Sequence, residues 1–221
     1  PAGTVAPGTS APPVPVTVAP VTAAPVTAAP VTAAPPAGSS GAAGLVTAAG
    51  AGWTASGLDG PVPAAGTCHY GRAADGYPLP DPACTPGAVD PTVTQADLRS
   101  TVCRAGGYSR SVRPPERLSG PFKRLSEAAY RDPRASSGTE LDHLVPLGLG
   151  GASDTRNLWA QPDQGRPAQF DPQDPFGINA KDGVEDRLHD AVCRGQVGLA
   201  AAQQAIASDW TTALARLGVS P

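Results

Sequence analysis

Residues 139–159 read TELDHLVPLGLGGASDTRNLW, and they indicate the architecture of the ordered part of the chain. They predict a short strand that ends at Asp142 and His143, a glycine-rich loop, and a second strand near 157–159. Adjacent residues of a regular strand point to opposite faces, so Asp142 and His143 can serve one site only where the backbone bends. Pro146 and the glycines that follow favour such a bend. The sequence therefore predicts a β-hairpin whose first strand ends in a carboxylate and an imidazole.

A helix is expected after this hairpin, over 179–193. Its apolar residues recur at helical spacing: Val184, Leu188, Ala191 and Val192. On the polar side, Glu185 and His189 stand four residues apart, so their side chains project from adjacent turns and could reach one ion. The intervening segment 161–177 is rich in Pro, Gln and Asp, and it predicts an irregular insertion.

Three further helices are expected around this hairpin and helix. Thr94 and Asp97 form a capping-box-like start for a short helix that ends near Cys103. A second helix is predicted over 121–130 and a third over 199–217. Apolar side chains mark one side of each, namely Phe122, Leu125 and Ala129 in the former and Leu199, Ala202, Ile206, Trp210 and Leu214 in the latter. The last stripe is expected in the core.

Composition divides the chain into two parts. All 16 Lys and Arg residues and 18 of the 19 Asp and Glu residues follow Cys68, and only Asp59 is charged before it. An exact PVTAA repeat begins at Pro20, Pro25 and Pro30. Proline removes backbone donors and small side chains bury little apolar area, so we expect residues 1–66 to be a disordered spacer before a domain at 67–221. A Thr-glycosylated stalk and an inert linker are both open interpretations of this spacer.

The cysteines favour disulfides over a zinc site. The four of them, Cys68, Cys84, Cys103 and Cys193, form no CxxC pair. Three pairings are possible; we favour Cys68 with Cys84, around a loop at 68–90, and Cys103 with Cys193, which would clamp an early helix to a late one. Disulfides indicate an oxidising compartment, so we expect a secreted or cell-surface protein. No run of about 18 apolar residues predicts a membrane span.

Basic residues gather in the segment 99–134. It holds nine Lys and Arg residues against three acidic ones, a local net charge of +6 in a chain whose total is −3. Phosphate backbones attract such a patch through counterion release, which is insensitive to base sequence. The alternative is an ordinary solvated face, with Arg113 packed beside the two prolines that follow it. We assign Arg110, Arg113 and Lys181 as candidates for substrate binding.

Several motifs occur in a fixed order along the chain. They are TVCRAGGYSRSVRPP, then ELDHLVPLGLGG, then NLW fourteen residues after His143, then KDGVEDRLHDAVC, then LAAAQQAIASDW. Together they resemble the bacterial secreted HNH-type endonucleases over roughly 93–210, which is a more specific likeness than a lone short motif. The resemblance implies a small disulfide-bonded α+β fold of the ββα-metal type, in which a hairpin and a helix hold one divalent ion and other helices flank them.

The hairpin residues have distinct roles in this interpretation. His143 is the natural general base, because an imidazole with a pKa near neutrality can accept a proton from water. By resemblance, Asp142 would bind the metal, and Asn157 would hydrogen-bond across the hairpin and fix the loop that orients His143. Hydrolysis of a phosphodiester also needs a cation to stabilise charge in the transition state.

The remaining metal ligands are expected on the helix. No His or Asn follows NLW in a compact Cys-framed loop, so the sequence departs here from the shortest HNH pattern. Glu185 and His189 are the first choice, with Asn179 and Asp182 as competitors for the same ion; an exposed polar face is the alternative. Carboxylate and water ligands would favour Mg²⁺, whereas His189 would shift the preference toward Mn²⁺, Ni²⁺ or Zn²⁺.

The sequence thus predicts an exported, metal-dependent endonuclease that acts as a monomer on DNA or RNA with little sequence preference. The alternative is a non-catalytic surface or cell-wall binding module that keeps the same scaffold. A toxin domain delivered to competitors is a third possibility and would use the same chemistry. The intact set of Asp142, His143 and Asn157 favours the enzyme, because a pure binding module has no chemical reason to keep it.

Overall fold

A computed structural model describes Gly3 and residues 44–132, 138–163 and 179–220. The chain separates into two units, Pro1–Gly38 and Ser39–Pro221, and every described residue but Gly3 belongs to the second. The PVTAA repeats and most of the expected insertion at 161–177 lie outside the described residues. The second unit is a mixed α and β structure with small sheets and two disulfides.

Short strands and helices alternate along this unit. The strands are β1 (Val46–Thr47), β2 (Trp53–Thr54), β3 (Gly57–Leu58), β4 (Gly71–Arg72), β5 (Pro78–Leu79), β6 (Ala88–Val89), β7 (Thr139–His143) and β8 (Leu158–Pro162). The α-helices are α1 (Tyr108–Val112), α2 (Glu116–Tyr130), α3 (Ala180–Cys193), α4 (Leu199–Ser208) and α5 (Ala213–Arg216). Three 3₁₀ turns are η1 (Gln95–Asp97), η2 (Leu147–Leu149) and η3 (Thr155–Asn157).

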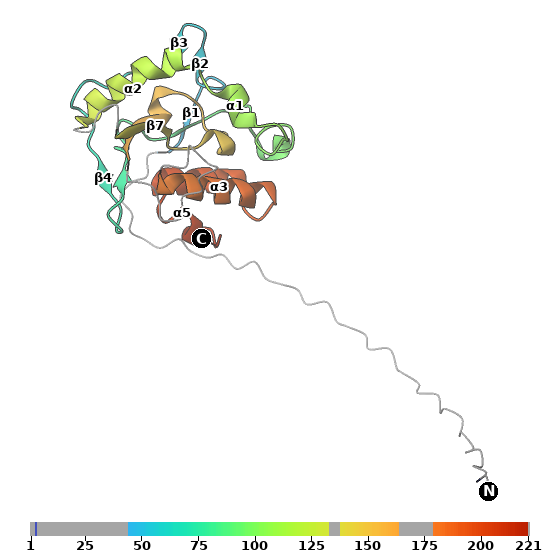
Figure 1. Cartoon of the computed structure of the whole chain (residues 1–221). Helices are drawn as coiled ribbons and strands as arrows, with labels where there is room; N and C mark the ends of the chain where they lie inside the picture. Colours follow the sequence, from blue (N-terminus) through green and yellow to red (C-terminus); the bar gives the residue numbers. More distant parts are fainter. Residues whose placement is uncertain (1–2, 4–43, 133–137, 164–178, 221) are drawn as a thin grey trace. The chain divides into compact units, whose positions relative to one another are not determined.

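The predicted hairpin and the helix after it are both present. Strands β7 and β8 pair antiparallel, with Asp142 opposite Trp159 and His143 opposite Leu158. Helix α2 packs on both strands, and α3 packs on the η2 turn that follows β7. Figure 1 shows β7 between α2 and α3. The end of β7 is therefore enclosed by two helices, which is where the sequence places its carboxylate and imidazole.

The expected helix over 94–103 is wrong. Only the single turn η1 forms, and the chain then continues through further turns to Cys103. The Ser100 and Thr101 hydroxyls both donate to the carbonyl oxygen of Asp97. Such side-chain bonds to the backbone compete with regular helix geometry and favour turns.

Helix α2 begins earlier than expected and buries a different face. It starts at Glu116 rather than Pro121. Its buried residues are Phe122, Ser126, Glu127, Ala129 and Tyr130. Leu125 is 48% exposed, so the prediction that it shares the buried side is wrong. The buried face of the helix passes through Ser126, whose hydroxyl accepts the N–H of Ala160 on β8. The helix is therefore rotated about its axis relative to the prediction, and Leu125 faces solvent.

The expected single helix over 199–217 is two helices. Asp209 is extended, and its carboxylate accepts hydrogen bonds from both the N–H and the hydroxyl of Thr211, so the chain turns there. Trp210 lies in the core as predicted, 2% exposed, and its indole N–H donates to the carbonyl of Pro78 at 3.1 Å.

The folded unit begins well before the boundary expected at residue 67. Strand β1 pairs in parallel with β6, and Ala51 and Asp59 accept backbone hydrogen bonds from Ser153 and Thr155. Gly52 has φ +80°, and a Cβ there would lie 2.4 Å from the backbone nitrogen of Asp154. Residues 44–66 thus pack against the hairpin loop, where Gly52 allows a close approach of the two backbones, so they are part of the folded unit.

Both favoured disulfides are confirmed. Cys68 pairs with Cys84 and Cys103 with Cys193. They indicate an oxidising, extracytoplasmic environment. None of the helices within the described ranges has the length and apolar character that a bilayer span requires.

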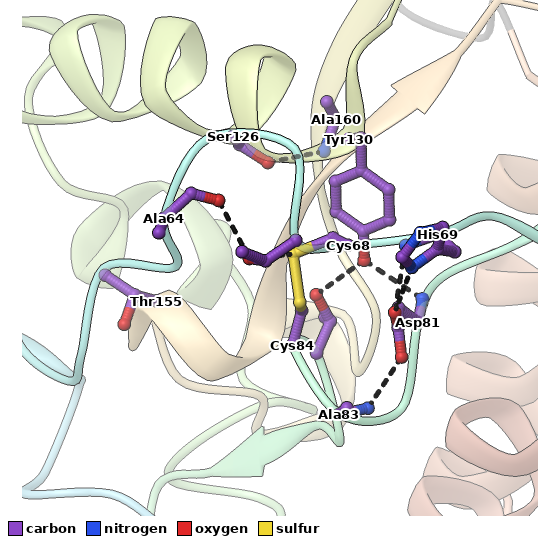
Figure 2. Close-up of a disulfide and its surroundings, with 12 residues drawn as sticks. Ala64, Cys68, His69, Asp81, Ala83, Cys84, Ser126, Tyr130, Thr155 and Ala160 are labelled. Carbon is purple, nitrogen blue, oxygen red and sulfur yellow. Dashed lines mark hydrogen bonds and ion pairs between the residues drawn. A yellow bond between two sulfur atoms is a disulfide. The ribbon is translucent and has the colours of Figure 1, made fainter.

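The first disulfide lies beside a buried phenol, as Figure 2 shows. The hydroxyl oxygen of Tyr130 accepts the N–H of Asp81 at 3.0 Å and lies 3.1 Å from the hydroxyl of Thr85. Burial raises the pKa of Tyr130 to about 12. The phenol is therefore held in its neutral form by the fold.

We predict that this phenol makes stability fall at alkaline pH. An unfolded tyrosine ionises near pH ~10, and the pKa of folded Tyr130 is higher, at about 12. The stabilisation from neutral Tyr130 is therefore complete below the unfolded pKa and is lost as the pH rises from the unfolded to the folded pKa. The loss should reach roughly 3 kcal/mol of unfolding free energy. Urea unfolding of the unmodified chain across this pH range should show this loss of unfolding free energy. Tyr130→Phe should remove this part of the pH dependence, whereas Tyr77→Phe, at a partly buried tyrosine, should keep it.

Candidate functional site

His143 ends strand β7 and is held by the loop that follows it. The side chain is buried, at 7% exposure, and its Nε2 lies 2.9 Å from the hydroxyl oxygen of Ser153. Its Nδ1 has no hydrogen-bond partner among the described residues. Burial, and then the positive charges of Arg113 and Lys181, lower the pKa of His143 to about 3. The imidazole is therefore neutral throughout the neutral pH range.

Asp142 is anchored from two sides. Its Oδ2 accepts the indole N–H of Trp159, its cross-strand partner, at 2.8 Å. The same oxygen lies 2.9 Å from the ammonium of Lys181. Both contacts use Oδ2, so Oδ1 has no hydrogen-bond partner within the part of the chain that the structure describes.

Lys181 is fully buried, at 0% exposure, on the first turn of α3. Its ammonium donates to the carbonyl oxygen of His143 at 2.8 Å and to Glu185 at 2.5 Å, in addition to its contact with Asp142. Burial alone would lower its pKa, but Asp142 and Glu185 outweigh that effect and raise it. The ammonium therefore stays charged inside the protein, instead of facing a substrate at the surface as the sequence had suggested.

These residues line a pocket of about 200 Å³ between the end of β7 and the start of α3. Its charged lining consists of Glu140, Asp142, Asp182, Glu185, Asp186 and Arg113. Counting the buried Lys181, five carboxylates face two cations. The pocket therefore carries an excess of negative charge.

Four of the carboxylates share one pattern of hydrogen bonding. Each uses one oxygen for a protein donor and has no partner for the other among the described residues. Asn179 supplies two of the donors: its Nδ2 bonds Glu140 at 2.7 Å and its backbone N–H bonds Asp182 at 3.1 Å. The arrangement resembles a capping box, but the Oδ1 of Asn179 itself is buried without a partner in the described structure. The side chains are thus oriented, with one oxygen of each left over.

Burial and crowding disfavour the charged forms of these carboxylates. The pKa of Glu140 is raised to about 7, first by burial and then by the charges of Asp142 and Asp182. Burial and Asp142 also raise the pKa of Glu185, and Lys181 offsets this only in part. The pKa of Asp182 is raised mainly by burial. A bound cation would relieve this repulsion.

The structure does not bring Glu185 and His189 to one pocket. Glu185 lines the pocket, whereas His189 lies beside the second disulfide, with its Nε2 3.0 Å from the carbonyl oxygen of Val102 and 3.5 Å from the sulfur of Cys193. Although both project from one side of α3, His189 lies next to Gly148 of the β7–β8 loop and turns to the second disulfide, so it does not line the pocket. Among the competitors, Asp182 lines the pocket, and Asn179 orients its carboxylates.

Asn157 makes the loop contacts expected of it. It is fully buried, its Oδ1 accepts the N–H of Val145, and its Nδ2 donates to the carbonyls of Val145 and Ala152. These three bonds, of 2.8–2.9 Å, close the loop between β7 and β8. Gly151 permits the closure, because a Cβ there would lie 1.8 Å from the carbonyl oxygen of Val145.

The two arginines assigned to substrate binding are both exposed, and Arg113 alone of them lines the pocket. Glu140, Asp186 and Ser153 near the site were missed. Glu140 could have been found from its position two residues before Asp142, which puts both on one face of a strand. Ser153 carried no such signal, because its contact with His143 depends on how the loop closes.

We predict that Lys181→Met destabilises the fold. It leaves Asp142 and Glu185 close together without their shared counterion, and breaking a buried pair this way costs about 3–5 kcal/mol. Chemical unfolding should show the loss. Arg194→Met is the control, because Arg194 pairs with Asp190 at the end of α3 with both side chains more than half exposed, and should cost no more than ~1 kcal/mol. Equal stability of the two variants would contradict this role of Lys181.

Comparison with known proteins adds no relative. No protein-family model, no curated protein and no solved structure matches the chain. What the site can do is therefore argued from its own residues and geometry.

Proposed function

We propose that this chain is an exported, divalent-metal-dependent endonuclease that hydrolyses phosphodiester bonds in DNA or RNA with little sequence preference. One observation carries the proposal. Oriented carboxylates, each with an oxygen to spare, line the same pocket as a neutral imidazole. This combination offers ligands for a cation and a base for a water molecule. Export is supported by the two disulfides.

The charge of the pocket makes a metal necessary for this function. Five carboxylates against two cations would repel a phosphodiester in the absence of a further positive charge. The residue types suit a hard cation, because the spare ligand atoms are carboxylate oxygens, those of Asp142 and Glu185 first and then those of Glu140 and Asp182. No three of the described carboxylates hold their oxygens within 4.8 Å of one another, so these side chains would close around the ion as it binds. Since His189 lies outside the pocket, Mg²⁺ or Mn²⁺ is favoured over softer ions.

The protein's own groups would divide the work in the following way. A bound divalent ion supplies charge stabilisation for the transition state and the leaving oxygen. With the Nε2–H of His143 donating to Ser153, the lone pair of Nδ1 is available to accept a proton from the attacking water. The pKa of about 3 keeps the imidazole neutral at the start of the reaction, but it also makes His143 a weaker base than the near-neutral imidazole expected from the sequence. Asn157 keeps the loop closed and so holds Ser153 against His143.

Arg113 is the group best placed to meet the substrate. It is exposed at the rim of the pocket, and it forms no ion pair with any described residue. Its guanidinium can bind a phosphate in bidentate fashion. Arg110 lies exposed nearby in the chain on α1 and would contact the backbone further along. Binding through phosphates predicts affinity that falls with salt and depends weakly on base sequence.

The decisive experiment is plasmid cleavage by the full chain. We expect nicking and linearisation with Mg²⁺ or Mn²⁺, and none after chelation. His143→Ala should reduce the rate by about 10²–10⁴-fold, the usual contribution of a general base. His69→Ala is the matched control, because His69 is an exposed histidine on the Cys68–Cys84 loop. Equal rates for His143→Ala and the unmodified chain would remove His143 as the base.

Tight, metal-independent binding of nucleic acid or cell-wall material without any cleavage would favour the non-catalytic module instead. A chain that cleaves equally well with chelator would contradict the metal requirement. Because the fold of each variant can be checked by circular dichroism, a loss of activity through unfolding is distinguishable from a loss of chemistry.

A second prediction concerns Glu140, which we expect to help hold the ion. Glu140→Gln keeps the size of the side chain and its acceptor for Asn179 but removes the negative charge that Glu140 carries above its pKa of about 7. We expect Mn²⁺ to bind about tenfold more weakly, the effect typical of losing a supporting carboxylate. Calorimetric titration with Mn²⁺ measures this directly. Glu116→Gln, at an exposed position on the first turn of α2, is the control and should leave Mn²⁺ binding unchanged.

A further inference from the structure

A second set of metal-ligating side chains lies around the disulfide that clamps α3. Ligand atoms of Cys103, His189 and Cys193 all lie within 4.8 Å of one another. The two sulfurs are joined in a disulfide, so they are not available as ligands in this state. We propose that reduction of this disulfide converts the cluster into a zinc site, with both cysteine thiolates and the His189 imidazole as ligands. The proposal does not depend on nuclease activity.

The nitrogen ligand and one sulfur ligand already lie at the spacing that tetrahedral zinc requires. Tetrahedral zinc, with Zn–S of about 2.3 Å and Zn–N of about 2.0 Å, places a nitrogen and a sulfur ligand ~3.5 Å apart. The Nε2 of His189 already lies 3.5 Å from the sulfur of Cys193. The two sulfurs must separate to ~3.8 Å, which rotation of their side chains can provide because the Cα atoms are 5.5 Å apart. Water would complete the tetrahedron.

The surroundings of His189 suit a ligand. Its Nε2–H now donates to the carbonyl oxygen of Val102 at 3.0 Å, so the imidazole must turn away from that carbonyl before Nε2 can bind zinc at about 2.0 Å. The proton would then reside on Nδ1, which lies 3.9 Å from a carboxylate oxygen of Asp190. A carboxylate that accepts the second ring N–H is the usual partner of a zinc-binding histidine, where it orients the ring and raises its basicity.

Access distinguishes this disulfide from the other. His189 is 36% exposed and Cys193 lies at the surface, whereas Cys68 in the first disulfide is 3% exposed. A soluble dithiol can therefore attack the Cys103–Cys193 bond first. The S–S bond breaks, the dithiol closes to its own cyclic disulfide, and two electrons and two protons pass to the two cysteine sulfurs. Zinc then displaces the thiol protons as it binds.

The zinc site would keep α3 linked to the turns before it in both oxidising and reducing compartments. The disulfide ties α3, which carries Asp182 and Glu185, to the turns that end at Cys103. In an oxidising compartment the covalent bond maintains this tie. In a reducing compartment that contains zinc, the metal would maintain it through the same three side chains.

The test uses the full chain, reduced without air and desalted, and zinc as the probe. We expect one tightly bound Zn²⁺ per chain, and no binding at this site by the oxidised protein. Co²⁺ should give the absorption of a tetrahedral ion with thiolate ligands. His189→Ala should weaken zinc binding by about 100-fold and Asp190→Asn by about tenfold. His69→Ala, beside the buried Cys68, should change nothing.

Failure to bind zinc after reduction, or equal affinity after His189→Ala, would overturn the proposal. Should reduction unfold the chain, the measurement becomes the recovery of helical circular dichroism on adding zinc. Recovery that His189→Ala abolishes supports the site, and absence of recovery rejects it. The Cys68→Ala, Cys84→Ala double variant removes the other thiols, so zinc that it still binds belongs to this cluster.

Discussion

One buried ammonium joins the two elements that make the site. Lys181 comes from α3, yet all of its donors are used on the end of β7 and on Glu185. A charge without solvent is tolerated only where it is fully paired, so neither element can move away without leaving charges exposed to an apolar interior. The separation of hairpin and helix, and thus the width of the pocket, is set by the reach of this side chain.

The same contact leaves the pocket short of positive charge. Lys181 is shared between Asp142 and Glu185, and Glu140 and Asp182 receive only neutral donors from Asn179. Burial first, and then the neighbouring charges of Asp142 and Asp182, raises the pKa of Glu140. Folding therefore stabilises an arrangement of like charges that an ion would complete, while the nearby imidazole remains uncharged.

Much of the fold could be predicted because its signals are local. The glycine-rich loop between two short apolar runs indicated the hairpin, and the spacing of apolar residues indicated α3. The break at Asp209 depends on one side chain bonding to Thr211, which competes with a continuous helical pattern. The segment 44–66 resembled a spacer in composition, and only its fit to the hairpin loop shows that it belongs to the fold.

The site was harder to predict, since its residues meet through tertiary contacts. Helix spacing correctly put Glu185 and His189 on one side of α3, but it could not show that His189 turns to the Val102 carbonyl while only Glu185 lines the pocket. A lysine is rarely buried, so nothing near Lys181 in the sequence suggested its position. Glu140 did carry a signal, because it precedes Asp142 by two residues and so lies on the same face of the strand. In a strand this short, one carboxylate is easily overlooked.

The close approach of Gly52 to Asp154 has a consequence for how the chain can be divided. The residues between Ser39 and Cys68 supply the acceptors for the backbone N–H groups of Ser153 and Thr155, on the loop whose Ser153 touches His143. A fragment cut where charged residues begin would expose those groups to water and lose the backing of that loop. An autonomous piece therefore has to keep the described residues from 44 onward, because they back the loop that holds His143.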